Sequence, residues 1–260
     1  MRVWATQYFW QNMGVAGTTV EGTTVKVIAH RGASAVEREN TLEAFREAVR
    51  LGADGVELDV RRTANDVLVA HHDAHLPDGR AIVELHDEEL PDWVPTLAEV
   101  MEVCREAACE RKFITHIEIK SAPGDPDYDA KLQVSAAVAG VVLGWAIGEH
   151  HGEVVVSSFD MEALNRIKDI APEIPTAYLT FEVLACDLLV DRVSAAHHTA
   201  IHSYVASTSQ ALVDAAHAAG LQINVWTVND PDQIVQVAAM GVDAVITDVP
   251  EVARSVLGKS

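Results

Sequence analysis

The stretch GVELDVRRT, residues 55–63, predicts a short strand, because its valines and leucine occupy every second position. A strand turns alternate residues to opposite faces, so Glu57 and Asp59 point the same way, about 6 to 7 Å apart. Two carboxylates so close repel each other, and burying either one alone costs several kcal/mol. For an isolated pair the simplest interpretation is an edge strand with a wet face, so the rest of the chain must decide.

Short β-rich runs alternate with helical patterns from residue 25 to the end of the chain. The predicted strands are 24–30, 54–60, 113–120, 153–159, 175–179, 192–198, 221–228 and 242–247, with 67–73 as a short continuation after the second. The predicted helices are 40–52, 96–107, 134–148, 160–171, 208–220 and 231–241. This alternation predicts an α/β protein, a (β/α)₈ TIM barrel rather than a six-stranded open sheet. We expect an N-terminal extension over 1–24 and a single barrel domain over 25–260, with a short insertion after the second strand.

Composition excludes several classes of partner. The 39 acidic residues against 19 basic ones give a net charge of −20, which argues against nucleic acid or an anionic membrane as the main partner. Three cysteines without a CxxC spacing predict free thiols and a cytoplasmic location. The uncharged run 134–148 is shorter than the roughly 20 apolar residues of a membrane span, so no stable membrane insertion is expected.

Ionisable residues gather at the predicted strand ends, where a barrel of this kind places its chemistry. Glu57, Asp59 and Glu118 end two different strands and together offer hard oxygen ligands suited to Mg²⁺ or Ca²⁺. A divalent ion would cancel most of the repulsion within the GVELDVRRT pair. His30 and His72 stand beside them and can pass protons near neutral pH.

Two permanent cations complete this group. Arg31 and Lys120 carry donors that match phosphate oxygens. A metal site, two histidines and two cations together indicate a phosphate ester that is cleaved by acid–base catalysis.

The motifs HRGAS, ENTLEAF, GADGVELDVRRT, AHHD, IEIK, SSFD, VWTVND and ITDVPEV, in this order, resemble the glycerophosphodiester phosphodiesterase family from about residue 25 to 255. The resemblance implies a (β/α)₈ barrel and a divalent-metal-dependent hydrolase. Its substrates would be small-molecule glycerophosphodiesters such as glycerophosphocholine or glycerophosphoethanolamine. The products would be sn-glycerol 3-phosphate and an alcohol.

The resemblance also implies roles for single residues. His30 and His72 resemble the acid–base pair, and Arg31 and Lys120 the phosphate contacts. Glu57, Asp59 and Glu118 resemble the metal ligands, and Phe159 and Trp226 resemble walls of the substrate pocket. This chain departs from the family pattern at Arg38, which stands before ENT where a proline is usual, and in a short acidic segment between His72 and Pro95. The second departure leaves the identity of the leaving group open.

Two other functions stay open at this point. A metal-assisted lyase or isomerase of the same fold would need Lys120 as its base but explains the paired histidines less well. A non-catalytic binding protein would tolerate the loss of either histidine. His197, His198 and His202 form a cluster with no role in the resemblance, and the first two are expected at the rim of the barrel.

The nucleophile also stays open. It is either water or the substrate's own glycerol hydroxyl beside the phosphodiester, which would form a transient cyclic phosphate; we hypothesise the second route. The headgroup, the choice between Mg²⁺ and Ca²⁺, the oligomeric state and the role of the N-terminal extension do not follow from the sequence.

Overall fold

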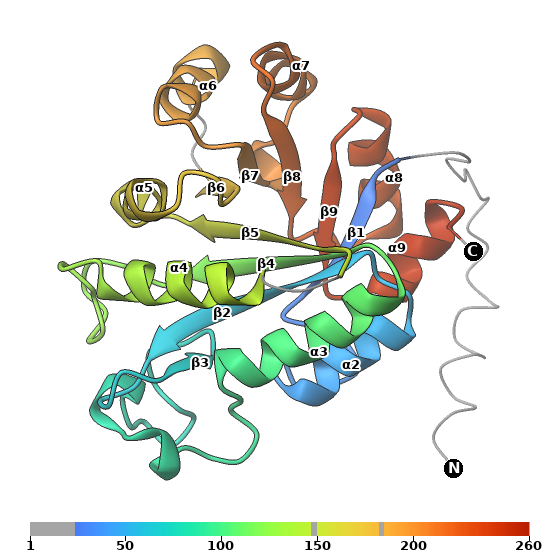
Figure 1. Cartoon of the computed structure of the whole chain (residues 1–260). Helices are drawn as coiled ribbons and strands as arrows, with labels where there is room; N and C mark the ends of the chain where they lie inside the picture. Colours follow the sequence, from blue (N-terminus) through green and yellow to red (C-terminus); the bar gives the residue numbers. More distant parts are fainter. Residues whose placement is uncertain (1–23, 147–149, 182–184, 260) are drawn as a thin grey trace, which may run out of the picture.

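The computed structural model describes residues 24–146, 150–181 and 185–259. Within them, eight parallel strands follow one another around a closed barrel, in the order β1, β9, β8, β7, β6, β5, β4 and β2, and pairing of β1 with β2 closes the ring (Figure 1). These strands are β1 Lys26–His30, β2 Gly55–Arg62, β4 Phe113–Ile119, β5 Gly152–Ser158, β6 Thr176–Thr180, β7 Ala200–Tyr204, β8 Gln222–Trp226 and β9 Ala244–Thr247. The predicted (β/α)₈ barrel is confirmed.

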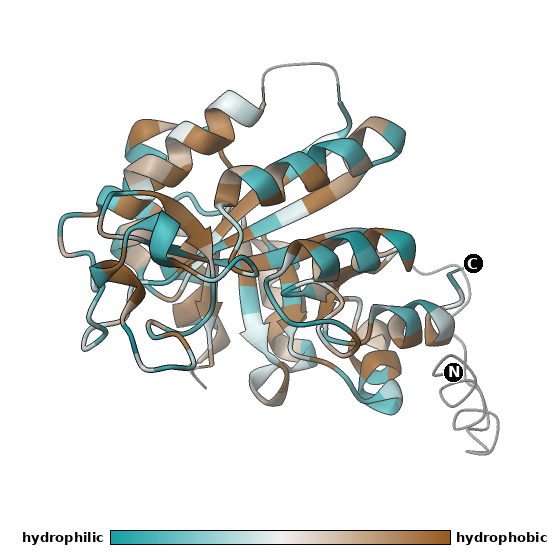
Figure 2. Ribbon diagram, turned by 90° about the horizontal axis from the view of Figure 1, so that it is seen from below, coloured by the Kyte–Doolittle hydropathy of each residue, from teal (hydrophilic) through white to brown (hydrophobic). Residues whose placement is uncertain are grey.

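Helices cover the outside of the barrel. They are α2 Leu42–Arg50, α3 Leu97–Glu110, α4 Gln133–Trp145, α5 Met161–Ile170, α6 Cys186–Ala195, α7 Gln210–Ala218, α8 Pro231–Ala239 and α9 Pro250–Val256. Their sequences explain where they begin: Thr96 and Glu99 form a capping box at α3, and the Asp230 side chain accepts from two backbone N–H groups at α8. The helices carry apolar residues on one face and polar residues on the other, visible as brown and teal in Figure 2.

The insertion after β2 is a folded unit. Strand β3 Leu68–Ala70 pairs antiparallel with β2, and two short 3₁₀ helices follow at Ile82–Glu84 and Asp87–Glu89. A separate hydrophobic cluster holds the segment together, formed by Val69, Leu76, Ile82, Leu85 and Val94. Trp93 packs against this cluster from the outside. The side chains of the insertion that face the mouth of the barrel are therefore supported by a packed hydrophobic cluster.

The strand predicted over 192–198 is wrong. Residues up to Ala195 belong to helix α6, and the strand of this unit is β7, Ala200–Tyr204. Val193 is buried in the helix together with Leu189 and Val190, so its apolar side chain serves helical and not strand packing. His197 and His198 consequently lie before β7, at the N-terminal end of the barrel and away from the edge where they were expected.

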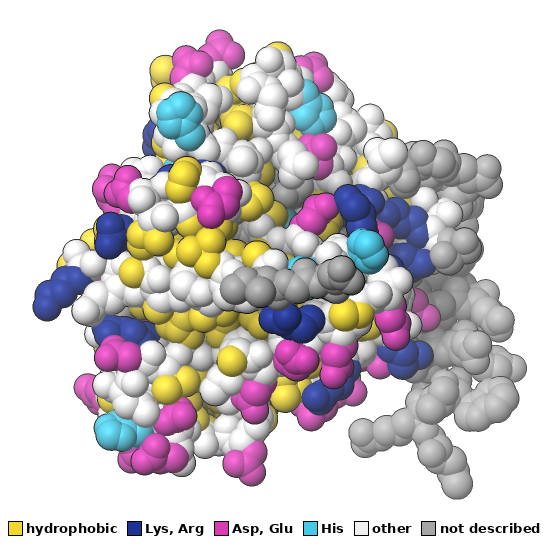
Figure 3. Space-filling model, in the orientation of Figure 1, with side chains coloured by type: hydrophobic (Ala, Val, Ile, Leu, Met, Phe, Trp, Pro, Cys, Tyr) yellow, Lys and Arg dark blue, Asp and Glu magenta, His cyan; other side chains and the backbone are white. Residues whose placement is uncertain are grey.

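Parts of the domain prediction stay outside the described residues. The extension predicted over 1–24 is described only at Thr24, and its separation from a domain over 25–260 stays a prediction. Helix α4, Gln133–Trp145, begins one residue before the predicted helix 134–148, and residues 147 and 148 of that prediction lie outside the described residues. No helix among the described residues is both long and apolar enough to cross a membrane. Acidic side chains are spread over the face seen in Figure 3, as the net charge implies.

Candidate active site

Three carboxylates meet at the C-terminal edge of the barrel, where β2 and β4 run side by side. Glu57 and Asp59 lie on β2, and Asp59 is in register with Glu118 of β4. All three are buried, and one oxygen from each lies within 4.8 Å of the others. Because β2 sits between β1 and β4, an edge strand with a wet face is the wrong interpretation of GVELDVRRT. The predicted convergence of the three acids is what the structure contains.

The three carboxylates have different pKa values because their surroundings differ. Burial, followed by repulsion from Asp59, raises the pKa of Glu57 to about 8. Burial also acts to raise the pKa of Asp59, but the Lys120 ammonium and the Arg31 guanidinium outweigh it and hold that pKa well below its usual range. The pKa of Glu118 is raised, mainly by burial. Further positive charge at this point would favour the ionised form of all three.

A divalent cation fits this donor set. Mg²⁺ and Ca²⁺ both prefer carboxylate oxygens, and each strand-borne carboxylate here is fixed by its backbone. Asn40 orients one of them: its Nδ2 donates to Asp59 Oδ2 at 2.7 Å, and the Asp59 backbone N–H donates to its Oδ1 at 3.2 Å. Asn40 adopts φ +56°, a conformation that asparagine tolerates better than most residues. The donor chemistry therefore suits a hard divalent cation.

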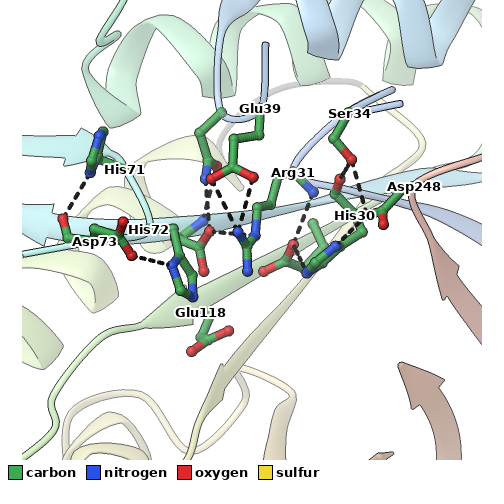
Figure 4. A network of polar contacts seen from close by, with 12 residues as sticks. His30, Arg31, Ser34, Glu39, His71, His72, Asp73, Glu118 and Asp248 are labelled. Carbon is green, nitrogen blue, oxygen red and sulfur yellow. Dashed lines mark hydrogen bonds and ion pairs between the residues drawn. The ribbon is translucent and has the colours of Figure 1, made fainter. Parts of the chain in front are cut away.

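Two cations border the carboxylates. Lys120 Nζ lies 2.8 Å from Asp59 Oδ1 and 2.6 Å from Glu118 Oε1. Arg31 Nε lies 3.2 Å from Asp59 Oδ2, and its Nη1 donates to both oxygens of Glu39 at 3.1 and 3.0 Å (Figure 4). Positive charge thus stands next to the acids, where the oxygens of a phosphate would meet it.

His30 ends β1 and is held by a carboxylate from the far end of the chain. Its Nδ1 lies 2.6 Å from Asp248 Oδ1, which also accepts from Ser34 Oγ at 3.0 Å (Figure 4). Asn229 Nδ2 donates to the other Asp248 oxygen at 2.5 Å. Burial acts to lower the pKa of His30, but the hydrogen bond to Asp248 and the charge of Glu57 outweigh it and raise that pKa. With Nδ1 engaged, Nε2 is directed toward Glu57, 4.0 Å from its Oε2.

His72 follows β3 and has a more open setting. Its Nδ1 lies 2.8 Å from Asp73 Oδ1, and its backbone carbonyl accepts from Arg61 Nε at 2.8 Å. Arg61 is itself fixed by Asp127, whose two oxygens lie 2.7 and 2.6 Å from Nη1. Burial, followed by the charge of Lys120, lowers the pKa of His72. The backbone of His72 is therefore anchored while its ring stands at the edge of a cavity.

That cavity measures about 1130 Å³ and is larger than most small-ligand pockets, which span roughly 300 to 1,000 Å³. His72 and Lys120 line it, together with aromatic side chains from both sides. Phe159 lines the cavity, and its part as a wall of the substrate pocket stays a prediction. Trp226 is not one of the described lining residues; it meets the Phe159 ring edge-on, with centroids 5.6 Å apart. Its part as a pocket wall stays a prediction.

The structure brings most of the predicted site residues together, and it adds partners. The residues that gather at this edge are His30, Arg31, Glu57, Asp59, His72, Glu118 and Lys120. The sequence gives Asp248 no role, although its place directly after the predicted strand 242–247 is a usable signal. Asn40 and Ser34 were missed, because nothing in their spacing reveals that a loop returns them to the barrel edge.

A second pair of histidines lies deeper in the barrel. His116 of β4 and His202 of β7 stack with their ring centroids 5.0 Å apart. Asn224 Nδ2 lies 3.0 Å from His202 Nε2. Burial lowers the pKa of His116 to about 4 and holds that of His202 well below its usual range. These rings therefore stay neutral near pH 7. His202, which the sequence grouped with His197 and His198 without a role, is thus a buried residue of the barrel interior.

Comparisons with known proteins agree with this geometry. The model of the glycerophosphoryl diester phosphodiesterase family matches residues 30–252. A glycerophosphodiester phosphodiesterase of Caldanaerobacter subterraneus subsp. tengcongensis is 31% identical over 251 residues, which cover 86% of this chain and 94% of that protein. An Oleispira antarctica phosphodiesterase, solved in complex with the product sn-glycerol-3-phosphate, is 26% identical with a TM-score of 0.79, covering 90% and 96% of the two chains.

A glycerophosphodiester phosphodiesterase from Thermotoga maritima is similar in the same way. It is 29% identical with a TM-score of 0.70, and the match covers 87% of this chain and 96% of that one. The family match spans most of the sequence and includes both the strand-end carboxylates and the two histidines. The chain belongs to the glycerophosphoryl diester phosphodiesterase family.

Proposed function

We propose that this chain is a phosphoric diester hydrolase that cleaves glycerophosphodiesters, such as glycerophosphocholine or glycerophosphoethanolamine, to sn-glycerol 3-phosphate and an alcohol. The observation that carries the proposal is the convergence of Glu57, Asp59 and Glu118 within 4.8 Å, beside two histidines that each bind an aspartate. Membership of the family supports the reaction class. The product bound by the Oleispira antarctica relative supports the substrate class.

The three carboxylates are the proposed ligands of one divalent cation, Mg²⁺ or Ca²⁺. When bound, such an ion withdraws charge from phosphoryl oxygens and acidifies a neighbouring hydroxyl. Arg31 and Lys120 are proposed to contact the phosphate, since both border the carboxylates with donors that suit phosphoryl oxygens.

His30 and His72 are the proposed acid–base pair. Each presents Nε2 to the site because Nδ1 is engaged by an aspartate oxygen. One ring takes the proton of the nucleophile while the other gives a proton to the leaving alcohol. This pair serves either nucleophile, water or the glycerol hydroxyl, and the order of the two histidines stays unassigned.

The alternative functions fit the structure less well. A lyase or isomerase needs a free base opposite the metal site, but Lys120 Nζ is bound by Asp59 and Glu118 on the same side as the proposed ligands. A non-catalytic binding protein leaves the aspartate partners of His30 and His72 without a purpose. Both groups of observations favour the hydrolase. A cytoplasmic location, inferred from the cysteine pattern, stays a prediction.

The test is cleavage of glycerophosphocholine with and without a chelator. We expect hydrolysis to stop after exhaustive chelation and to return with Mg²⁺ or Ca²⁺. Metal should also raise the melting temperature of the wild type, because binding at one hundred times Kd stabilises the folded state by about 2.7 kcal/mol.

The matched variants are Asp59→Asn with Glu118→Gln, and Glu153→Gln as a control. The double variant removes two proposed ligands and should lose both activity and the rise in melting temperature. Glu153 is an exposed acid bound to Lys112 at the N-terminal end of β5, so its variant should behave like the wild type. Full activity after chelation, or an equal melting rise in the double variant, contradicts the metal assignment.

A further inference from the structure

Arg38 lies on the loop between β1 and α2, in the position where the family pattern usually has proline, so the resemblance assigns it no role. Its side chain is exposed and lines the same cavity as His72 and Lys120. It stands two positions before Asn40, the residue that orients Asp59. A cation that departs from the family pattern therefore borders the space beside the proposed chemistry.

The guanidinium of Arg38 is held in place by stacking. Its Cζ lies 4.1 Å from the centroid of the Trp93 ring, and the same ring lies 5.7 Å from that of His71. Trp93 in turn packs on the hydrophobic cluster of the insertion. The attraction to the ring uses none of the N–H donors of the guanidinium, so they stay available to a ligand. The stack therefore prepares a planar donor group at the mouth of the cavity.

Arg38 differs from the other cations of the cavity in its partners. Lys120 is bound by Asp59 and Glu118, and Arg61 by two aspartates. Within the described parts of the chain, no carboxylate lies within ion-pair distance of Arg38. Its neighbour Glu39 is occupied by Arg31. Among the residues that the structure describes, the positive charge of Arg38 is thus not neutralised by an ion-pair partner.

The dimensions of the cavity favour an extended leaving group. About 1130 Å³ is several times what a phosphodiester and a glycerol fill, and the leaving alcohol is the part of such a substrate that varies. Arg38 and Lys120 line the same cavity, so a leaving alcohol that extends from a phosphate at Lys120 toward the insertion would bring an anionic group to the guanidinium.

We propose that the Arg38–Trp93 stack is a specificity subsite that binds a carboxylate or another oxyanion on the leaving alcohol. The inference rests on the glycerophosphodiester hydrolysis proposed above and adds the class of leaving group. Because the contacted group takes no part in bond cleavage, the subsite acts on substrate binding. Its effect therefore belongs mainly to KM.

A matched pair of substrates tests it. Glycerophosphoserine and glycerophosphoethanolamine differ by one carboxylate on the leaving alcohol. We expect Arg38→Ala to lower kcat/KM for glycerophosphoserine about tenfold, the scale of one hydrogen bond to a charged group, through KM. The value for glycerophosphoethanolamine should stay within about twofold. Arg38→Lys keeps the charge without the planar fork and should recover part of the loss.

Arg46→Ala is the control for the overall field. Arg46 is exposed on α2 and does not line the cavity, so its removal changes the net charge equally without touching the subsite. It should leave the ratio between the two substrates unchanged. An equal change for both substrates in Arg38→Ala overturns the subsite. Cleavage of neither substrate by the wild type instead overturns the hydrolase itself, so the two failures are distinct.

Discussion

The histidines at the two ends of the barrel share a side chain and differ in what surrounds it. At the C-terminal edge, an aspartate oxygen lies 2.6 Å from Nδ1 of His30, and another lies 2.8 Å from Nδ1 of His72. At the N-terminal end, His198 meets Thr176 Oγ1 and the sulfur of Met161, each at 2.9 Å, and burial lowers its pKa to about 4. An aspartate partner at the edge that holds the three carboxylates distinguishes these two histidines from His198, which packs.

The largest expected effect is a loss of kcat when either histidine of the C-terminal edge is replaced. His30→Gln and His72→Gln should each lower kcat by about 10²- to 10⁴-fold, because a positioned acid or base contributes on that scale. His198→Gln should retain kcat within about twofold at a temperature well below unfolding. The measurement is steady-state hydrolysis of glycerophosphocholine, with circular dichroism to confirm folding. A His198 variant as inactive as the other two would remove the distinction.

A smaller effect separates the two aspartates. Asp248→Asn should lower kcat about 10²-fold and shift the limb of the pH profile that belongs to His30 to lower pH, since Asp248 raises that pKa. Asp73→Asn should cost only a few-fold, because its side chain is 75% exposed and an exposed ion pair contributes little. Matching pH profiles for wild type and Asp248→Asn would show that Asp248 has only a structural role.

The smallest effect concerns the stability of the packed end. His198 has a pKa of about 4 in the folded protein and an ordinary value of 6.5, so below pH 6.5 the unfolded chain binds more protons. Its contribution is complete above pH 6.5 and falls by about 2 kcal/mol as the pH drops to 4.5. Urea unfolding across this range should show a shallower loss in His198→Gln. Parallel pH dependences for the two proteins would contradict the assignment.

Most of the barrel could be predicted from the sequence, because burial on both faces of a parallel strand leaves a strong local pattern. The failure at 192–198 has a physical cause. Val193 and its alanine neighbours fit a helix face as well as a strand, and the helix becomes evident only with Leu189 and Val190 included. Helix α9 was not predicted, since seven residues beginning with proline give little periodicity.

The candidate site, like the fold, could be predicted only where a local sequence pattern marks it. The carboxylates and histidines could be predicted because the fold places all strand ends at one edge. The bond between His30 and Asp248 and the stack of Arg38 on Trp93 join segments far apart in the chain, and no local pattern encodes them. The buried stack of His116 on His202 was also missed. The sequence around a histidine in a strand is the same whether the histidine is catalytic or packed in the core.

The bond between His30 and Asp248 spans 218 positions and crosses the seam between β1 and β9. A ribosome therefore releases nearly the whole barrel before the partner of His30 is synthesised, and domains generally fold as units during synthesis. A nascent chain that stops short of β9 carries both histidines and all three strand-borne acids, but its first histidine is unsupported. Such a chain also lacks the pairing of β1 with β9, so the support of His30 and the closure of the barrel arrive with the same segment.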